Sequence, residues 1–134
     1  MEPRLDLIGI VTDDMAASLA FYRRLGVPVP DLVEKDAPHV EAVLPGGLRL
    51  AWDSAEMVRS ITPEWDPRPA GQRVGLAFLC DGPAEVDRTY AELVAAGHPG
   101  EQEPWDAFWG QRYAVVRDPD GNSVDLFAPL PVNA

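Results

Sequence analysis

Apolar and polar positions follow two different periods along the chain, and these periods predict its elements. Residues 5–12 are short, apolar and partly β-branched, which is typical of a strand. The next apolar residues recur at the spacing of one helix face: Met15, Leu19, Tyr22 and Leu25. Asp13 or Asp14 can cap this helix, and Gly26 can end it. The chain therefore begins with a predicted strand and an amphipathic helix.

Three further strands are predicted in the first half, at 27–33, about 39–44 and 48–52. A Pro-Gly-Gly turn precedes the last of them. Residues 53–72 contain three prolines and no sustained period. We expect a connector there, with a helical turn near 54–59.

The second half repeats this order. It has a predicted strand at 74–80 and a helix that begins near Pro83 and ends before Gly97. Three more strands follow, near 99–104, 111–117 and 123–128. Both halves thus predict strand, helix, strand, strand, strand, and a Pro-x-Gly turn precedes the last strand of each. This internal repeat is the strongest indication of the architecture.

Composition and charge narrow the possible functions. The 134 residues suit one domain, or two small halves that share a core. A net charge of −11 without any basic stripe disfavours nucleic-acid binding. No apolar run approaches the roughly 20 residues that span a membrane. Charged residues interrupt the N-terminal stretch, so it does not resemble a signal peptide, and we expect a cytoplasmic protein.

The most informative stretch lies near the C-terminal end. Trp105, Phe108 and Trp109 stand in a polar, turn-rich context just upstream of two short apolar runs. The sequence Asp118-Pro119-Asp120-Gly121-Asn122 separates these runs and predicts a hairpin. Together the aromatic residues favour the rim of a pocket for a planar ligand. Each one singly suits the core or a dimer interface at least as well.

The duplicated βαβββ unit resembles the vicinal oxygen chelate superfamily. The resemblance includes Leu19-Ala20-Phe21-Tyr22 in the first helix and Asp118-Pro119-Asp120-Gly121-Asn122 before the last strand. That superfamily includes glyoxalase I, extradiol dioxygenases, fosfomycin-resistance enzymes and bleomycin-resistance proteins. The resemblance implies an α+β fold in which tandem repeats form a curved mixed sheet around a cavity. It also implies one domain over residues 1–134, with repeats at 1–53 and 73–134 and a connector at 54–72.

Metalloenzymes of the superfamily carry metal-binding side chains at four equivalent strand positions. By this resemblance the positions correspond to Leu7, Ala51, Gly75 and Asp125. Three of the four have no donor atom in the side chain, and one carboxylate does not hold a divalent metal against water. We therefore expect no metal and no cofactor, and we assign no catalytic residue. Of the two histidines only His39 is a candidate for the cavity, with a surface or turn position as the alternative.

Strand alternation places seven residues on the predicted concave face: Leu7, Gly9, Ala51, Gly75, Ala77, Asp125 and Phe127. Most of them are small and leave room for an apolar ligand, unless large side chains such as Phe127 and Trp52 fill it. Asp125 can meet a cationic group of a ligand, act as a base, or form an ion pair with Arg112 or Arg49. We slightly favour the ion pair.

The leading hypothesis is a metal-free protein of the bleomycin-resistance kind that sequesters a bulky aromatic natural product such as an antibiotic. Its predicted ligand-binding residues are Trp52, Trp105, Phe108, Trp109, Tyr113, Asp125, His39 and Phe127. The resemblance implies a homodimer with two pockets between its subunits. One alternative is an enzyme of the lyase, isomerase or dioxygenase kind that uses Asp125 or His39 as a general base. Another is a dimeric domain without a small ligand, whose aromatic residues hold the interface.

Overall fold

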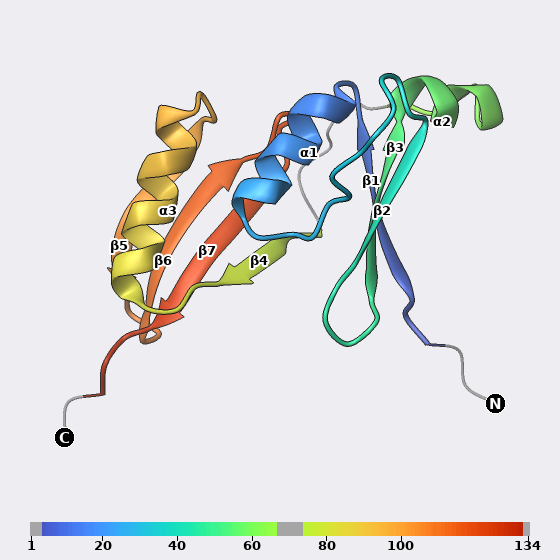
Figure 1. Ribbon diagram of the computed structural model, residues 1–134. Helices are drawn as coiled ribbons and strands as arrows, with labels where there is room; N and C mark the ends of the chain where they lie inside the picture. Colours follow the sequence, from blue (N-terminus) through green and yellow to red (C-terminus); the bar gives the residue numbers. More distant parts are fainter. Residues whose placement is uncertain (1–3, 67–73, 133–134) are drawn as a thin grey trace. The chain divides into compact units, whose positions relative to one another are not determined.

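The computed structural model describes residues 4–66 and 74–132, which belong to two compact units, Met1–Arg68 and Pro69–Ala134 (Figure 1). Each unit combines a mixed sheet with helices, so the predicted α+β class is confirmed. The boundary between the units falls inside the expected connector, of which residues 67–72 lie outside the described residues. Among the described residues, no helix has both the length and the apolar character needed to cross a membrane.

The first unit consists of a three-stranded sheet and two helices. Its elements in chain order are β1 (Leu7–Thr12), α1 (Met15–Arg24), β2 (His39–Val43), β3 (Arg49–Ser54) and α2 (Ala55–Ile61). The strand order is β1-β3-β2, with β1 parallel and β2 antiparallel to β3. Gly9 and Glu41 are the register partners of Ala51 on its two sides, so these three residues share one face of the sheet.

Helix α1 packs on the other face of this sheet. At its start the Asp14 side chain accepts a hydrogen bond from the backbone N–H of Ala17 (3.0 Å). Just past its end Gly26 adopts a φ of 84°, a conformation that glycine adopts without steric cost. The ring centroids of Tyr22 and Trp52 lie 5.7 Å apart, and both side chains are fully buried. The apolar stripe of α1 therefore covers the side of β3 that bears Trp52.

The predicted strand at 27–33 is wrong. These residues form no strand, although Val27 and Val29 are buried. Pro28 and Pro30 alternate with the valines, and a proline has no N–H with which to join a sheet. The Arg23 side chain holds the segment instead, because its Nη2 donates to the carbonyl of Pro30 (2.7 Å). The apolar alternation here reflects a loop with buried side chains.

The second unit is built around a four-stranded sheet. Its elements are β4 (Leu76–Leu79), α3 (Pro83–Ala95), β5 (Gly100–Ala107), β6 (Gln111–Arg117) and β7 (Ser123–Pro129). The strand order is β4-β7-β6-β5, and only the β4–β7 pair is parallel. In both units the first strand thus pairs in parallel with the last strand. Within the described part of the first unit, no strand corresponds to β5, because residues 27–33 form a loop.

Helix α3 covers one face of the second sheet (Figure 1). The side chains that fill this layer are fully buried: Val86, Leu93, Val116, Val124 and Leu126. Alternation along β7 turns Asp125 and Phe127 to the opposite face, where both are only half-buried. The second sheet therefore has a packed face towards α3 and another face that carries candidate ligand-binding residues.

The predicted hairpin between β6 and β7 is present and is organised by Asp118, which is 2% exposed. Its Oδ1 accepts from the backbone N–H groups of Asp120 (2.9 Å) and Asn122 (2.8 Å). Its Oδ2 accepts from the Asn122 side-chain amide (2.8 Å). Gly121 adopts a φ of 87°. One buried carboxylate thus holds the turn that sets the β6–β7 register.

Candidate functional site

Five aromatic side chains gather at one place in the second unit. We call them the aromatic cluster: Trp105, Phe108, Trp109, Tyr113 and Phe127. Tyr113 lies at its centre, since it is the register partner of Trp105 on β5 and of Phe127 on β7. Its ring centroid lies 5.5 Å from that of Trp105, 5.3 Å from that of Trp109 and 6.3 Å from that of Phe127. The contacts of Tyr113 with the two tryptophans are edge-to-face, an arrangement that the ring quadrupoles favour.

Two members of the cluster lie in the turn between β5 and β6 and are exposed. The exposed fraction is 97% for Phe108 and 49% for Trp109. Gly110 closes the turn with a φ of 94°, and its N–H donates to the carbonyl of Ala107 (3.0 Å). The Trp109 indole donates to Gln111 Oε1 (2.7 Å), and its ring lies 6.1 Å from the Trp105 ring. A tight turn therefore presents two aromatic rings beside the sheet face.

A carboxylate borders the cluster on the same face. The Tyr113 hydroxyl donates a hydrogen bond to Asp125 Oδ2. Burial, followed by this hydrogen bond and the charge of Asp125, raises the pKa of Tyr113 to about 12. The phenol therefore stays neutral at physiological pH and acts as a hydrogen-bond donor. The structure thus brings six of the predicted site residues together: Trp105, Phe108, Trp109, Tyr113, Asp125 and Phe127.

The expected ion pair between Asp125 and Arg112 is wrong. Arg112 adjoins Tyr113 on β6, so its side chain lies on the opposite face of the sheet. There it donates to Asp87 Oδ1 (2.9 Å) and Asp106 Oδ1 (3.1 Å). Arg49 belongs to the first unit and is bonded to carboxylates of that unit. Strand alternation separates Asp125 from Arg112. Arg117, which lies two positions from the Asp125 register partner Val115, bonds to Glu101 instead.

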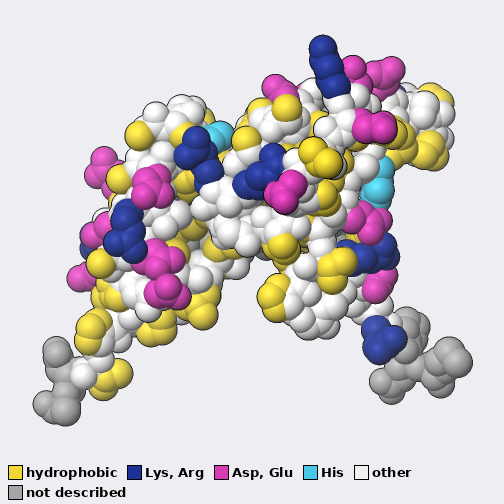
Figure 2. Space-filling model, viewed as in Figure 1, with side chains coloured by type: hydrophobic (Ala, Val, Ile, Leu, Met, Phe, Trp, Pro, Cys, Tyr) yellow, Lys and Arg dark blue, Asp and Glu magenta, His cyan; other side chains and the backbone are white. Residues whose placement is uncertain are grey.

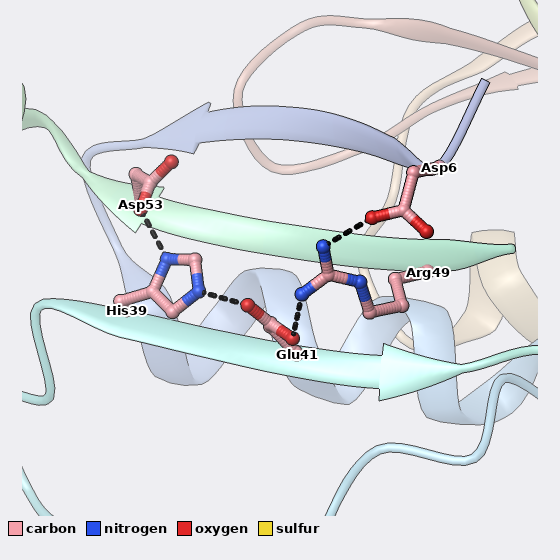
Figure 3. A network of polar contacts seen from close by, with 5 residues as sticks. All are labelled: Asp6, His39, Glu41, Arg49 and Asp53. Atoms are coloured by element: carbon pink, nitrogen blue, oxygen red, sulfur yellow. Dashed lines mark hydrogen bonds and ion pairs between the residues drawn. The ribbon is translucent and has the colours of Figure 1, made fainter. Parts of the chain in front are cut away.

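A second group of polar side chains lies on the face of the first sheet opposite α1 (Figure 3). We call it the polar network: Asp6, His39, Glu41, Arg49 and Asp53. His39 Nδ1 lies 2.5 Å from Asp53 Oδ1, and its Nε2 lies 2.7 Å from Glu41 Oε2. Arg49 donates from Nη1 to Glu41 Oε1 (2.7 Å) and from Nη2 to Asp6 Oδ2 (2.5 Å). Acids and bases therefore alternate along one chain of contacts.

The polar network favours the charged forms of His39 and Glu41. Hydrogen bonds to Asp53 and then to Glu41 raise the pKa of His39 above its ordinary value of 6.5. The hydrogen bond with His39, followed by that with Arg49, lowers the pKa of the Glu41 carboxyl. The His39 side chain is 42% exposed, so it also meets solvent. Because carboxylates bond to both ring nitrogens, His39 has no ring nitrogen free for a ligand in this arrangement.

The residues of the chain do not fit a catalytic metal of the kind found in the resembled metalloenzymes. Leu7 and Ala51 have no donor atom, and Asp125 is bonded to Tyr113. In the polar network, Asp53 and Glu41 bond to different nitrogens of His39, so the three side chains do not converge on one point. Over residues 4–66 and 74–132, no group of three acidic, histidine or cysteine side chains is arranged to hold a metal ion.

Trp52, which the sequence predicts to bind the ligand, lies in the core and away from the aromatic cluster. Trp52 is fully buried against Tyr22, on the face of β3 opposite the polar network. Its indole nitrogen has no hydrogen-bond partner among the described residues, which marks it as part of the apolar layer under α1. No ligand reaches this side chain without opening the core.

Of the polar network, the sequence predicts only His39 as a site residue. Its members occupy alternate positions on neighbouring strands, His39 and Glu41 on β2 and Arg49 and Asp53 on β3. Such spacing places side chains on one face of a strand, and it was the signal available to find them. Their pairing across strands depends on the register, which the sequence does not show directly.

Comparisons with known proteins identify the class to which this architecture belongs. The sequence profile of the Glyoxalase/Bleomycin resistance protein/Dioxygenase superfamily matches residues 4–126, so the chain belongs to this superfamily. The prediction of the vicinal oxygen chelate superfamily is thereby confirmed. Among curated proteins the chain is similar to an uncharacterized protein, YraH of Bacillus subtilis (strain 168). The two are 28% identical over 127 residues, which cover 92% of this chain and 96% of YraH.

Solved structures agree with this assignment. The crystal structure of a glyoxalase/bleomycin resistance protein/dioxygenase from Nocardioides has a TM-score of 0.72 at 28% identity, over 99% of this chain and 87% of that chain. A family enzyme from Burkholderia phytofirmans PsJN has a TM-score of 0.79 at 21% identity, over 96% of this chain and 100% of that chain. At that identity the likeness concerns the fold alone. The predicted fold is confirmed.

Proposed function

We propose that this chain is a metal-free binding protein that sequesters a planar aromatic natural product, such as an antibiotic, on its aromatic cluster. The observation that carries the proposal is the arrangement of exposed rings around Tyr113 in the second unit. Phe108 and Trp109 are the most exposed members of the cluster. Rings held in this way offer a large contact area at little cost in side-chain entropy.

The cluster is not explained by the core of its unit. The α3 side of the sheet already contains the fully buried residues Val124 and Leu126. The aromatic residues lie on the other side of the strands or in the β5–β6 turn, so they do not fill that layer. Exposed apolar surface of this kind marks binding sites in soluble proteins.

Family membership supports the proposal without deciding it, because the superfamily includes both enzymes and resistance proteins in its name. Sequestration needs affinity and no bond chemistry, which suits a chain that lacks side-chain donors at three of the four positions that correspond to the family's metal ligands. The proposal includes a cytoplasmic homodimer, which is carried over from the resemblance to bleomycin-resistance proteins. A symmetric partner is a common way to cover exposed aromatic surface.

Native mass spectrometry of the purified protein with a panel of aromatic and peptide antibiotics tests this proposal. We expect the mass of a dimer that gains up to two intact ligand molecules. A monomer that binds an intact ligand would correct the oligomeric state only. No binding across the panel would refute sequestration of this class of compound.

Tryptophan fluorescence then tests the location of the site. Trp109→Ala is expected to weaken binding about tenfold or more, because edge-to-face and stacking contacts contribute about 0.5–1.5 kcal/mol each. Trp65→Ala is the matched control, since Trp65 lies in the first unit and contacts the Arg59 guanidinium, 5.2 Å from its ring centroid. Equal affinity of the Trp109→Ala and Trp65→Ala variants would place the ligand elsewhere.

The alternative function is an enzyme of the same superfamily. The contact between His39 and Asp53 supports it, because a carboxylate that orients a histidine is typical of general bases. His39 would act as a base only after its Nε2 is released from Glu41. Recovery of each bound compound distinguishes the two functions. An unchanged mass supports sequestration. A changed mass that disappears in His39→Gln or Asp125→Asn would establish catalysis.

A further inference from the structure

The Asp125 carboxylate lies at the edge of the aromatic cluster, and it forms no ion pair with any residue in 74–132. Within 74–132 the second unit has three arginines, and each of them bonds to a group other than Asp125. Arg112 binds Asp87 and Asp106, Arg117 binds Glu101 and the carbonyl of Gly121, and Arg88 binds Glu85. Among the described residues, the partner of Asp125 is the neutral Tyr113 hydroxyl.

This arrangement leaves a negative charge that is only partly compensated. Asp125 is half-buried between the buried residues Val124 and Leu126. A carboxylate near apolar surface loses hydration, and one hydrogen bond from a neutral hydroxyl restores only part of it. A positively charged group of a ligand would compensate the remaining loss of hydration.

The rings beside Asp125 attract the same kind of charge. Phe127 lies two positions further along β7 on the same face, and its ring centroid is 6.3 Å from that of Tyr113. Trp105 and Trp109 both meet Tyr113 in edge-to-face contacts, and Trp109 is also 49% exposed to solvent. The face of an aromatic ring is negative and attracts organic cations within about 6 Å of its centroid.

The net negative charge of the whole chain also attracts cations. Asp and Glu number 22 against 11 Lys and Arg. Figure 2 shows acidic side chains gathered over α3, on the second unit. A field of this sign raises the local concentration of cations and their rate of association, and added salt screens it.

We propose that the aromatic cluster and Asp125 together select a ligand that is an organic cation, with its flat ring on the aromatic side chains and its positive nitrogen at the Asp125 carboxylate. This inference rests on the proposed function, because it names the class of ligand for the same site. In this inference Asp125 determines the specificity for cations. The aromatic rings contribute affinity for charged and neutral ligands alike.

Two probes of the same shape separate charge from ring stacking: N-methylacridinium, which is a permanent cation, and acridine, which is neutral at pH 8. Equilibrium dialysis against the full chain gives both dissociation constants at 0.15 M NaCl. We expect N-methylacridinium to bind about tenfold tighter than acridine, in the range of a cation near both an aromatic face and a carboxylate. We expect both probes to weaken in Trp109→Ala.

Asp125→Asn removes the charge while keeping an oxygen that accepts from Tyr113. We expect this variant to bind the two probes within about twofold of each other and to keep its affinity for acridine. Glu92→Gln is the matched control, since it removes an exposed carboxylate of α3, on the other side of the sheet. It should keep the tenfold preference. Asp125→Ser is a second charge-removing variant, and thermal unfolding confirms that each variant is folded.

The outcomes separate this inference from the proposed function. Equal binding of both probes by the wild-type chain would overturn the cation inference and leave the aromatic binding site standing. The preference for N-methylacridinium could also persist in Asp125→Asn and disappear at 0.5 M NaCl. This result would mean that the overall charge of the chain causes the preference, and it would also overturn the inference. If the wild-type chain binds neither probe, the proposed binding of planar rings fails as well.

Discussion

Replacing Trp52 tests whether this residue belongs to the core, and two opposing effects decide the result. Its indole N–H is buried without a partner among the described residues, and a donor left in this state costs about 1–3 kcal/mol. Trp52→Phe removes that donor and leaves a gap of roughly 40 Å³, which costs about 1 kcal/mol at about 24 cal/mol per Å³. We therefore expect the free energy of unfolding of Trp52→Phe to lie within about 1 kcal/mol of the wild-type value.

Trp52→Ala is the companion variant, because it removes the donor and most of the apolar volume together. Burial against Tyr22 predicts a loss of about 3–5 kcal/mol. Urea unfolding followed by far-ultraviolet circular dichroism measures both variants without relying on the tryptophan signal. A loss above about 2 kcal/mol in Trp52→Phe would refute the reasoning about the unpartnered donor. Weaker ligand binding by a folded Trp52→Phe would refute the assignment of Trp52 to the core.

Two further predictions concern the Asp118 turn and the polar network. Asp118→Ala removes three hydrogen bonds to a buried carboxylate, so we expect a loss of about 2–4 kcal/mol in urea unfolding. Asp118→Asn keeps an acceptor oxygen and should lose less. The raised pKa of His39 predicts that its network stabilises the fold below pH 6.5, where the unfolded chain is also protonated. This contribution is lost as the pH rises through the folded value, so the difference in stability between wild type and His39→Gln should be larger at pH 6 than at pH 9.

Each of these predictions has a result that contradicts it. Equal stability of Asp118→Ala and wild type would mean that the turn holds without its carboxylate. A difference between wild type and His39→Gln that does not change with pH would mean that the charge of His39 plays no part in the first unit. Proton NMR of the His39 ring checks the direction of the pKa shift independently of unfolding.

Local signals in the sequence were sufficient for the helices and for most strands. Asp14 and Gly26 delimit α1 as expected, because capping and positive φ are properties of single residues. The prediction of a strand at 27–33 is wrong for a different reason. Apolar alternation reports burial, and burial also occurs in a loop whose prolines withhold the N–H groups that a sheet needs.

The sequence predicts the placement of the candidate site residues when the alternation of side chains between the two faces of a strand is applied strictly. The pattern that places Ala51 on the concave face puts Trp52 on the other face, and the prediction gave more weight to the size of Trp52 than to its position. Likewise, Tyr113 on the site face leaves Arg112 on the opposite one. The contacts across strands in the polar network depend on register, which arises from the turns and the packing of the whole unit.

The parallel pairing of first and last strands has a consequence for how the site forms during synthesis. β7 pairs with both β4 and β6, and it leaves the ribosome after these two strands because it follows them in the chain. Until β7 joins the sheet, Trp105, Trp109 and Tyr113 have neither Phe127 nor Asp125 beside them. The parallel contact between β4 and β7, which are far apart in the chain, forms late because closing a long loop costs entropy. A nascent or truncated chain thus has most of the rings of the cluster and lacks the charge that we assign to selectivity.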